Sequence, residues 1–294
     1  MNLLTVGILA LVQGITEFLP ISSSGHLVAA QLLLGLREVP VLFDLILHLG
    51  TAAATLLVYF RVVGSLLKAL LLWPIRGSGG RESQLRLAGY LAAATVMTAA
   101  VGFLFRDRIT SFFYRPEYLP LFFSVTGCLL LGTRFIPAPG GSARGVDPKS
   151  KDAQSRDAQS KDAHGRAVEN MGLPRSAVIG LAQAAAMFPG ISRSGSTISA
   201  GLYLGMRRDS AAAFSFLLSL PSILGASLVE YLHQGSPGGA PPLLLVYGFF
   251  IALAAGYGAL RLLLTFVRRG RLHLFAYYCF AAAATLFVLG RPWS

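Results

Sequence analysis

The sequence predicts an all-α polytopic membrane protein, with about six transmembrane helices and two re-entrant, broken-helix hairpins arranged as an inverted-topology repeat. Three observations favour this class. Only 13% of the 294 residues are charged, whereas a soluble domain has about 25%. Long apolar runs recur along the chain, and one glycine- and serine-rich segment occurs twice. A large soluble helical core does not fit, because its helices would need charged faces.

Several apolar runs contain no Lys or Arg, and each approaches the roughly 20 residues that cross a bilayer. They are 41–60, 87–105, 118–133, 209–232, 241–260 and 272–290. The first residues, MNLLTVGILALVQG, lack the basic start of a cleaved signal peptide. We therefore expect the N-terminus to be retained.

The two glycine- and serine-rich segments, 13–37 and 183–207, are related by a shift of 170 residues. Eleven of their 25 aligned positions are identical, and ISSSG aligns with ISRSG. Each copy precedes an apolar run, and three apolar runs separate the copies. If each broken segment re-enters the membrane and returns on its own side, the two copies are inverted and their tips meet near the midplane.

We therefore expect a single membrane domain over 1–294, with repeat 1 at about 1–105 and repeat 2 at about 174–290. Between them, a flexible cytoplasmic loop is predicted at about 138–172. Its segment 148–166, PKSKDAQSRDAQSKDAHGR, has low complexity and alternating charge, and such composition cannot bury enough apolar surface to become ordered. A helical or partner-binding role of this segment is the alternative.

The basic residues set the expected orientation. The stretches 61–86, 138–175 and 261–271 are basic, whereas 233–240 has no Lys or Arg. All three basic stretches fall on one side of the predicted topology, which is the cytoplasmic side by the positive-inside rule. Both termini are then outside, the first hairpin enters from outside and the second from inside. The net charge of +12 thus indicates anionic membrane lipids, and we expect no nucleic acid.

The hairpin tips carry the polar groups that suit phosphoryl chemistry on an amphipathic substrate. Backbone that is not helical at membrane depth must be buried or line a cavity. An arginine matches phosphate oxygens, glycine-rich turns aim N–H groups at anions, a carboxylate holds a cation or a proton, and histidine can be a nucleophile or an acid. The groups are Glu17, Ser22, Ser23, Ser24, His26, Ser192, Arg193, Ser194, Ser196 and Thr197.

Each of these residues also has a purely structural interpretation. Serines and threonines in membrane helices often bond only to backbone or join helices. Arg193 fits this interpretation poorly, because an intramembrane arginine is costly and usually functional. Asp44 and His48 share a helix face and form either a structural pair or part of the cavity lining.

The segments QGITEFLPISSSGH (13–26) and PGISRSGSTIS (189–199) resemble the two signature motifs of the undecaprenyl-diphosphate phosphatase family, the bacitracin-resistance type. The first family motif is [E/Q]xxxE before a serine-rich turn and His, and the second is PGxSRSxxT. The resemblance covers nearly the whole chain except the 138–172 insertion. It implies an inverted-repeat membrane phosphatase of the bacterial inner membrane, with its active site on the extracytoplasmic side.

Such an enzyme would hydrolyse C55 isoprenyl diphosphate to the monophosphate, recycling the lipid carrier of peptidoglycan synthesis and conferring bacitracin resistance. Carried over by position, the implied catalytic residues are Glu17, Ser23, His26 and Arg193. The implied substrate-binding residues are Gln13, Ser22, Ser24, Gly190, Ser192, Ser194, Gly195 and Thr197. Glu17 would also bind a divalent cation, Mg²⁺ or Ca²⁺.

The attacking group is Ser23, His26 or water. Gln13 stands where many members have glutamate, which weakens any mechanism with two carboxylates, and His48 stands where glutamine is expected. A homodimer is one oligomeric state that the sequence leaves open.

Three other functions fit the sequence less well. Type-2 phosphatidic-acid phosphatases also have an SGH element, but they need a second histidine and an aspartate that SRSGSTISAGLY does not contain. A transporter or lipid flippase suits inverted repeats with broken helices, and combined hydrolysis and flipping stays open. A membrane scaffold does not explain a costly arginine beside a glutamate and a histidine.

Overall fold

The computed structural model describes residues 2–36, 39–137, 168–234 and 241–289, so the predicted segment 148–166 lies outside the described residues. Within these ranges every regular element is a helix. Five helices are long and apolar enough to cross a membrane. Four lie in α3 (Val41–Arg76), α4 (Glu82–Leu104), α10 (Arg208–Gln234) and α11 (Pro242–Arg268). The fifth is the stretch Pro116–Phe135, which consists of α6 (Leu119–Gly132) and a short 3₁₀ helix at each of its ends. The predicted all-α polytopic class is therefore confirmed.

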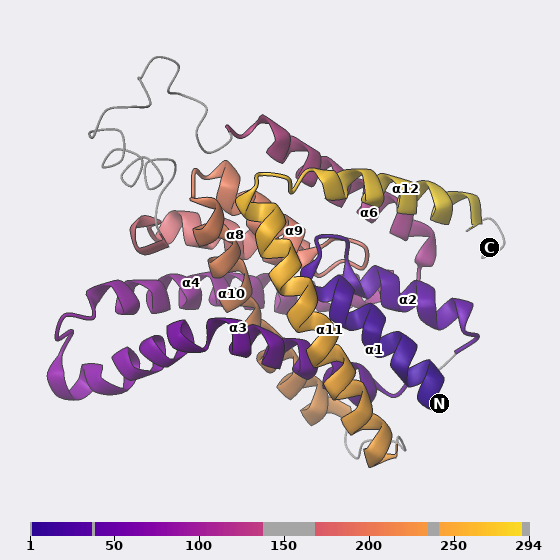
Figure 1. Ribbon diagram of the computed structural model, residues 1–294, viewed down its shortest axis with the longest axis horizontal. Coiled ribbons are helices and arrows are strands. Elements are labelled where there is room, and N and C mark those ends of the chain that lie inside the picture. Colours follow the sequence, from indigo (N-terminus) through magenta and orange to yellow (C-terminus); the bar gives the residue numbers. More distant parts are fainter. Residues whose placement is uncertain (1, 37–38, 138–167, 235–240, 290–294) are drawn as a thin grey trace, which may run out of the picture.

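Two shorter helix pairs form the predicted hairpins, and a tight turn joins the helices of each pair (Figure 1). The first pair is α1 (Leu3–Phe18) and α2 (Ser23–Leu33), and the second is α8 (Leu173–Ala185) and α9 (Arg193–Tyr203). At 16, 11, 13 and 11 residues, none of the four reaches the length of a full span. The sequence breaks them with proline and glycine, which end a helix.

The second helix of each hairpin begins with the same cap. Ser22 Oγ accepts the N–H of Gly25 at 3.4 Å, and Ser192 Oγ accepts the N–H of Gly195 at 3.1 Å. These side chains satisfy donors that the first helical turn leaves unpaired. The repeated ISSSG and ISRSG segments thus fold into the same local structure.

Helix pairing follows the repeat. Helix α1 packs along α11, and its counterpart α8 packs along α4. Helix α3 contacts α10, and α6 lies beside α12 (Leu274–Leu289) (Figure 1). In the repeat, α1 corresponds to α8 and α11 corresponds to α4. The pairing of α1 with α11 is therefore equivalent to the pairing of α8 with α4. The inversion of the copies across a membrane stays a prediction.

The helices extend beyond the predicted spans. The basic stretch 61–86 separates two predicted spans, but α3 continues through it to Arg76 after a bend at Tyr59, where φ is −107° and ψ is 19°. Helix α11 likewise continues to Arg268, and 106–113 forms the short helix α5. The boundaries were misplaced because they followed the charges. A long basic side chain lays its aliphatic stem along a helix without ending it.

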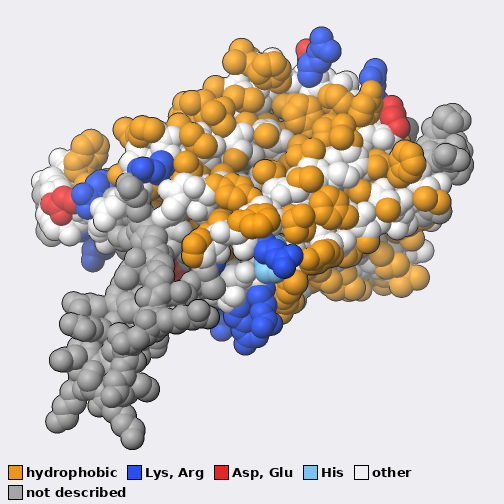
Figure 2. All heavy atoms as spheres, turned by 90° about the horizontal axis from the view of Figure 1, so that it is seen from above, with side chains coloured by type: hydrophobic (Ala, Val, Ile, Leu, Met, Phe, Trp, Pro, Cys, Tyr) orange, Lys and Arg blue, Asp and Glu red, His pale blue; other side chains and the backbone are white. Residues whose placement is uncertain are grey.

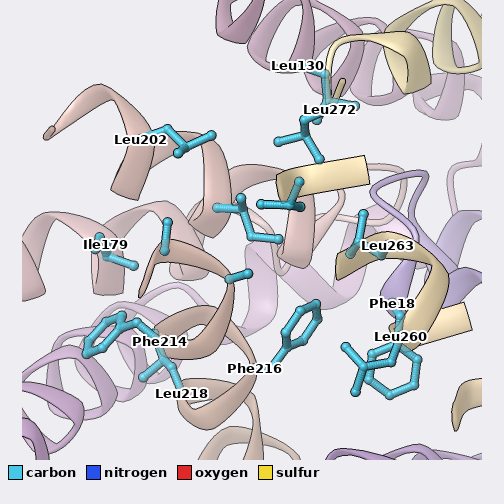
Figure 3. Close-up of a cluster of buried hydrophobic side chains, with 14 of the residues drawn as sticks. Phe18, Leu130, Ile179, Leu202, Phe214, Phe216, Leu218, Leu260, Leu263 and Leu272 are labelled. Carbon is cyan, nitrogen blue, oxygen red and sulfur yellow. The ribbon is translucent and has the colours of Figure 1, made fainter. Parts of the chain in front are cut away.

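Many large hydrophobic side chains are exposed on the outer surface. Figure 2 shows hydrophobic side chains over most of one face, with Lys and Arg gathered at a few places. Inside, the largest buried cluster joins the end of the first hairpin to α10 and α11, through Phe18, Phe216, Leu260 and Leu263 (Figure 3). This cluster anchors the tip of the first hairpin in the body of the protein.

Gly14 allows the close contact between α1 and α11. A Cβ at this position would lie 2.7 Å from Ala255 Cβ and 2.8 Å from the Ala252 carbonyl oxygen. Because overpacking costs about 1–3 kcal/mol, we expect Gly14→Ala to lower the free energy of unfolding by about that amount, measured by thermal unfolding in detergent. Gly64→Ala is the matched control, since no atom lies within 4 Å of its Cβ position. Equal stability of the two variants would contradict this account of the interface.

Candidate active site

A cavity of about 480 Å³ lies between the hairpin tips and the spanning helices. Its wall combines one carboxylate, one guanidinium, one imidazole and several hydroxyls with apolar side chains. The lining residues are Glu17, Ser23, Ser24, Leu45, His48, Thr98, Phe113, Gln183, Ala186, Met187, Arg193, Ser222, Ile223, Ala226 and Ser227. The cavity wall therefore offers both charged and apolar groups.

Glu17 is the centre of the polar network. Its Oε2 accepts hydrogen bonds from Gln13 Nε2 at 3.0 Å and from Ser23 Oγ at 2.7 Å. Its Oε1 is paired with the guanidinium of Arg193. Gln13 lies one helical turn before Glu17 on α1, which places both side chains on one face. The network joins the first hairpin to the second.

The ion pair of Glu17 and Arg193 is largely withdrawn from solvent. The side chains are 5% and 19% exposed, respectively. Removal of one partner would leave the other charge uncompensated, which makes such pairs costly to break. The predicted meeting of the two hairpin tips is thus present in the structure as a direct contact.

The cavity also receives the starts of two helices. Ser23 is the first residue of α2 and Arg193 is the first residue of α9, and both line the cavity. A helix N-terminus carries partial positive charge and unpaired N–H groups. Together with the guanidinium, the two N-termini make this part of the cavity wall suitable for a phosphate-bearing anion.

His48 belongs to the cavity lining, whereas Asp44 does not. His48 Nδ1 lies 2.8 Å from the Asp44 carbonyl oxygen, and His48 Nε2 lies 4.0 Å from Glu17 Oε2. The two residues are therefore linked through the Asp44 backbone, and His48 faces the carboxylate.

His26 is not among the residues that line this cavity. Its Nδ1 lies 2.7 Å from the Ser22 carbonyl oxygen, and its Nε2 lies 2.6 Å from the Tyr278 hydroxyl. A carbonyl only accepts, so Nδ1 carries the proton and Nε2 accepts from Tyr278. The ring also stacks on Tyr278 and meets the edge of Phe123. A catalytic role for His26 stays a prediction, and this placement favours a role in holding the hairpin.

Predicted site residues that do not line the cavity form hydrogen bonds within and between the hairpin tips. Ser194 Oγ donates to the Leu19 carbonyl oxygen at 3.4 Å, which ties the second tip to the first. Thr197 Oγ1 donates to the Arg193 carbonyl oxygen at 2.8 Å and lies 2.6 Å from Ser215 Oγ. Apart from Glu17, Ser23, Ser24 and Arg193, none of the predicted site residues is among those that line this cavity.

Thr126 of α6 holds the second tip, and the sequence did not single it out. Its Oγ1 accepts the N–H of Ser192 at 3.0 Å and lies 3.1 Å from the Gly190 carbonyl oxygen. These contacts bridge 66 and 64 residues of sequence. A lone threonine in an apolar run carries no signal that could have identified this role.

We expect Thr126→Val to lower the free energy of unfolding by about 1–3 kcal/mol, because the Ser192 N–H loses its partner in a buried position. Thr265→Val is the matched control, since the exposed Thr265 hydroxyl donates to the Arg261 carbonyl oxygen of its own helix. Thermal unfolding of both variants in detergent is the measurement. A Thr126 variant as stable as the control would show that the tip does not depend on this hydroxyl.

A second polar cluster lines the cavity and was also missed. Gln183 Nε2 donates to Thr98 Oγ1 at 3.1 Å and to Ser222 Oγ at 2.8 Å. A signal did exist, because the repeat aligns Gln183 with Gln13. The two glutamines differ in partner, since Gln13 binds a carboxylate and Gln183 binds hydroxyls.

The lining is compatible with a divalent cation, provided that a ligand supplies further oxygens. No group of three or more His, Cys, Asp or Glu side chains gathers anywhere in the described part of the chain. Mg²⁺ is commonly held by one or two carboxylates together with substrate phosphates. Glu17 supplies one carboxylate, and Ser23 Oγ adds a neutral oxygen beside it.

Known proteins resemble this chain over a range that includes the whole candidate site. The family model described as Bacitracin resistance protein BacA matches residues 6–285. An undecaprenyl-diphosphatase of Rubrobacter xylanophilus is 39% identical over 298 residues, covering 98% of each chain. One of Treponema denticola is 36% identical over 280 residues, 95% of this chain and 94% of its own. One of Salinibacter ruber is 37% identical over 283 residues, 93% and 94%. The matched range includes both hairpins and the cavity between them.

Proposed function

The chain belongs to the bacitracin resistance protein family, and from this membership we infer that it is an undecaprenyl-diphosphatase. It hydrolyses undecaprenyl diphosphate to undecaprenyl phosphate and inorganic phosphate. The product is the lipid carrier of peptidoglycan synthesis, so the activity recycles this carrier and confers bacitracin resistance. The single observation that supports this function for the site is the contact of Glu17 and Arg193, which come from the two motif-bearing hairpins and both line the cavity.

The charged and the apolar residues of the cavity wall match the two parts of the substrate. Arg193 and the N-termini of α2 and α9 would bind the diphosphate, with Arg193 exchanging Glu17 for phosphate oxygens. The apolar wall, which includes Leu45, Met187 and Ile223, would receive the first part of the isoprenyl chain. The remaining chain would lie in the bilayer, along the exposed apolar helices.

Ser23 is the proposed nucleophile. Its hydroxyl donates to Glu17 Oε2 at 2.7 Å, which is the contact of a nucleophile with its general base. Ser23 Oγ would attack the terminal phosphorus and pass its proton to Glu17. The bond from that phosphorus to the bridging oxygen breaks, and undecaprenyl phosphate leaves with this oxygen. Water then cleaves the phosphoserine and releases inorganic phosphate.

We expect Ser23→Ala to lower kcat for phosphate release by about a hundredfold or more, since both steps of the covalent route need this oxygen. Ser65→Ala is the matched control, because the Ser65 hydroxyl donates to the Val62 carbonyl oxygen far from the cavity wall. Trapping of a phosphorylated wild type by rapid acid quench would support the route. A Ser23 variant with nearly full activity would assign the attack to water instead.

Glu17 is also the proposed ligand of the divalent cation, Mg²⁺ or Ca²⁺. When bound, such a cation neutralises charge on the transferring phosphoryl group. The remaining ligands would be oxygens of the diphosphate itself, because Glu17 is the one carboxylate among the residues of the cavity wall.

The chain is a multi-pass membrane protein. We propose the bacterial inner membrane, with both termini outside and the cavity open to the extracytoplasmic side. The basic stretches near 61–86 and 261–271 support this orientation through the positive-inside rule.

The activity is tested by phosphate release from undecaprenyl diphosphate with the purified full chain in detergent, with and without EDTA. We expect release without EDTA and its loss with EDTA, restored by excess Mg²⁺ or Ca²⁺. Release that EDTA does not affect would remove the cation from the proposal and leave the phosphatase. A folded protein that releases no phosphate with any cation would overturn the enzyme and favour lipid transport.

A further inference from the structure

Six arginines lie in three short segments at helix ends, 131–137, 204–210 and 266–273. They are Arg134, Arg207, Arg208, Arg268, Arg269 and Arg271, and we call them the arginine cluster. Asp209 is the one acidic residue in these three segments. None of the six arginines is among the residues that line the active-site cavity. The cluster is therefore a basic feature separate from the active site.

Contacts of Arg208 and Arg268 hold the three segments together. The Arg208 guanidinium donates to the Pro137 carbonyl oxygen at 2.9 Å. The same guanidinium lies against Gly270, where a Cβ would be 3.1 Å from Arg208 Nη2. Arg268 Nε donates to Asp209 Oδ1 at 2.8 Å, which joins the end of α11 to the start of α10. The segments are thus adjacent in space although they are far apart in the sequence.

The outer members of the cluster are Arg134, Arg269 and Arg271, and all three are exposed. Within the part of the chain that the structure describes, none of their side chains forms an ion pair or a hydrogen bond. Arg134 lies three residues before Pro137, and Arg269 and Arg271 flank Gly270. Each therefore starts within three residues of a contact of the Arg208 guanidinium, and their N–H donors are available to a ligand with several anionic oxygens.

Exposed apolar side chains lie next to these arginines. Phe135 follows Arg134, and Leu274 begins α12 shortly after Arg271. Both side chains are more than 40% exposed. Arginine beside exposed apolar surface is the arrangement expected at the boundary between headgroups and acyl chains. The positive-inside rule requires basic residues on one side of the membrane, but it does not require them to converge from three segments.

We propose that the arginine cluster binds the headgroup of an anionic phospholipid in the cytoplasmic leaflet. Arg208 and Arg268 hold the frame, and Arg134, Arg269 and Arg271 donate to the phosphate oxygens of the headgroup. The acyl chains of this phospholipid lie along the neighbouring apolar helix surfaces. The site is distinct from the cavity that is proposed to bind the isoprenyl diphosphate, and it does not depend on the phosphatase activity.

The test measures lipid binding to the purified full chain in detergent by native mass spectrometry. Phosphatidylglycerol is the anionic probe, and phosphatidylethanolamine is its zwitterionic counterpart. We expect the wild type to bind phosphatidylglycerol with the lower Kd. Arg269→Gln/Arg271→Gln should raise this Kd about tenfold or more, because each arginine near a membrane surface contributes about 1 kcal/mol. Arg134→Gln, on another of the three segments, should raise it about fivefold.

Arg106→Gln/Arg108→Gln is the matched control, since both of these arginines are exposed and lie on α5, outside the cluster. It should keep the wild-type Kd for phosphatidylglycerol, as should Arg193→Ala, which changes the cavity instead. Thermal unfolding without added lipid shows whether each variant is folded. Arg134→Gln tests the site by itself if the double variant of the cluster does not fold.

Three results would overturn the proposal. The first is an equal Kd for the two lipids, and the second is a cluster variant that binds phosphatidylglycerol as well as the Arg106/Arg108 control does. The third is a loss of binding in Arg193→Ala, which would assign the lipid to the cavity. Glycerol phosphate, the soluble headgroup, should not displace the lipid at similar concentrations, and displacement would show a site for soluble phosphates instead. Because phosphate release is not measured, the proposed function is tested separately.

Discussion

Arg193→Ala is expected to lower kcat/KM for undecaprenyl diphosphate by about a hundredfold or more. The guanidinium is the single basic side chain among the residues of the cavity wall, and loss of one preorganised group that stabilises transition-state charge costs about that factor. Arg193→Lys should recover part of the activity, because lysine keeps the charge but loses the planar fork. Steady-state phosphate release in detergent is the measurement.

Arg268→Ala is the control for this prediction. Arg268 also forms an ion pair, at 2.8 Å from Asp209, but both side chains are exposed and lie away from the cavity. Exposed pairs contribute little to stability, so this variant should keep wild-type activity. If Arg193→Ala retained activity close to that of Arg268→Ala, the diphosphate would not be bound where the hairpins meet.

Glu17→Gln is expected to abolish phosphate release to a similar extent and also to destabilise the fold. The amide removes the proposed base and cation ligand, and it leaves the guanidinium of Arg193 without its counter-charge. Because breaking a buried ion pair costs about 3–5 kcal/mol, the loss of unfolding free energy should approach that range. Thermal or denaturant unfolding in detergent, beside phosphate release, measures both effects.

The double variant Glu17→Gln/Arg193→Ala separates the two causes. It removes both charges, so it should unfold at a higher temperature than Glu17→Gln alone, while it stays inactive. The losses of activity should fall short of additivity, because the two side chains act in one network. Independent, additive losses in stability would refute the ion pair as a structural link between the hairpins.

The parts of the fold that could be predicted depend on local sequence patterns. Apolar runs set the spans because each span must exclude charge over about 20 residues. The repeat of ISSSG and ISRSG located both hairpin tips, since each tip uses a serine cap that depends on neighbours within three residues. Helix ends were predicted less well. For example, α3 continues past Arg61 to Arg76, since a basic side chain does not by itself end a helix.

The membrane class, the two hairpins and the candidates Glu17, Ser23 and Arg193 could all be inferred from the order of the residues. Which side chains face the cavity could be known only from the packed helices. Their packing turned His26 toward Tyr278, brought His48 to Glu17 and placed Thr126 behind the second tip. The physical reason is that these partners lie on different helices, so each contact depends on how whole helices pack rather than on the local residues that any sequence pattern records.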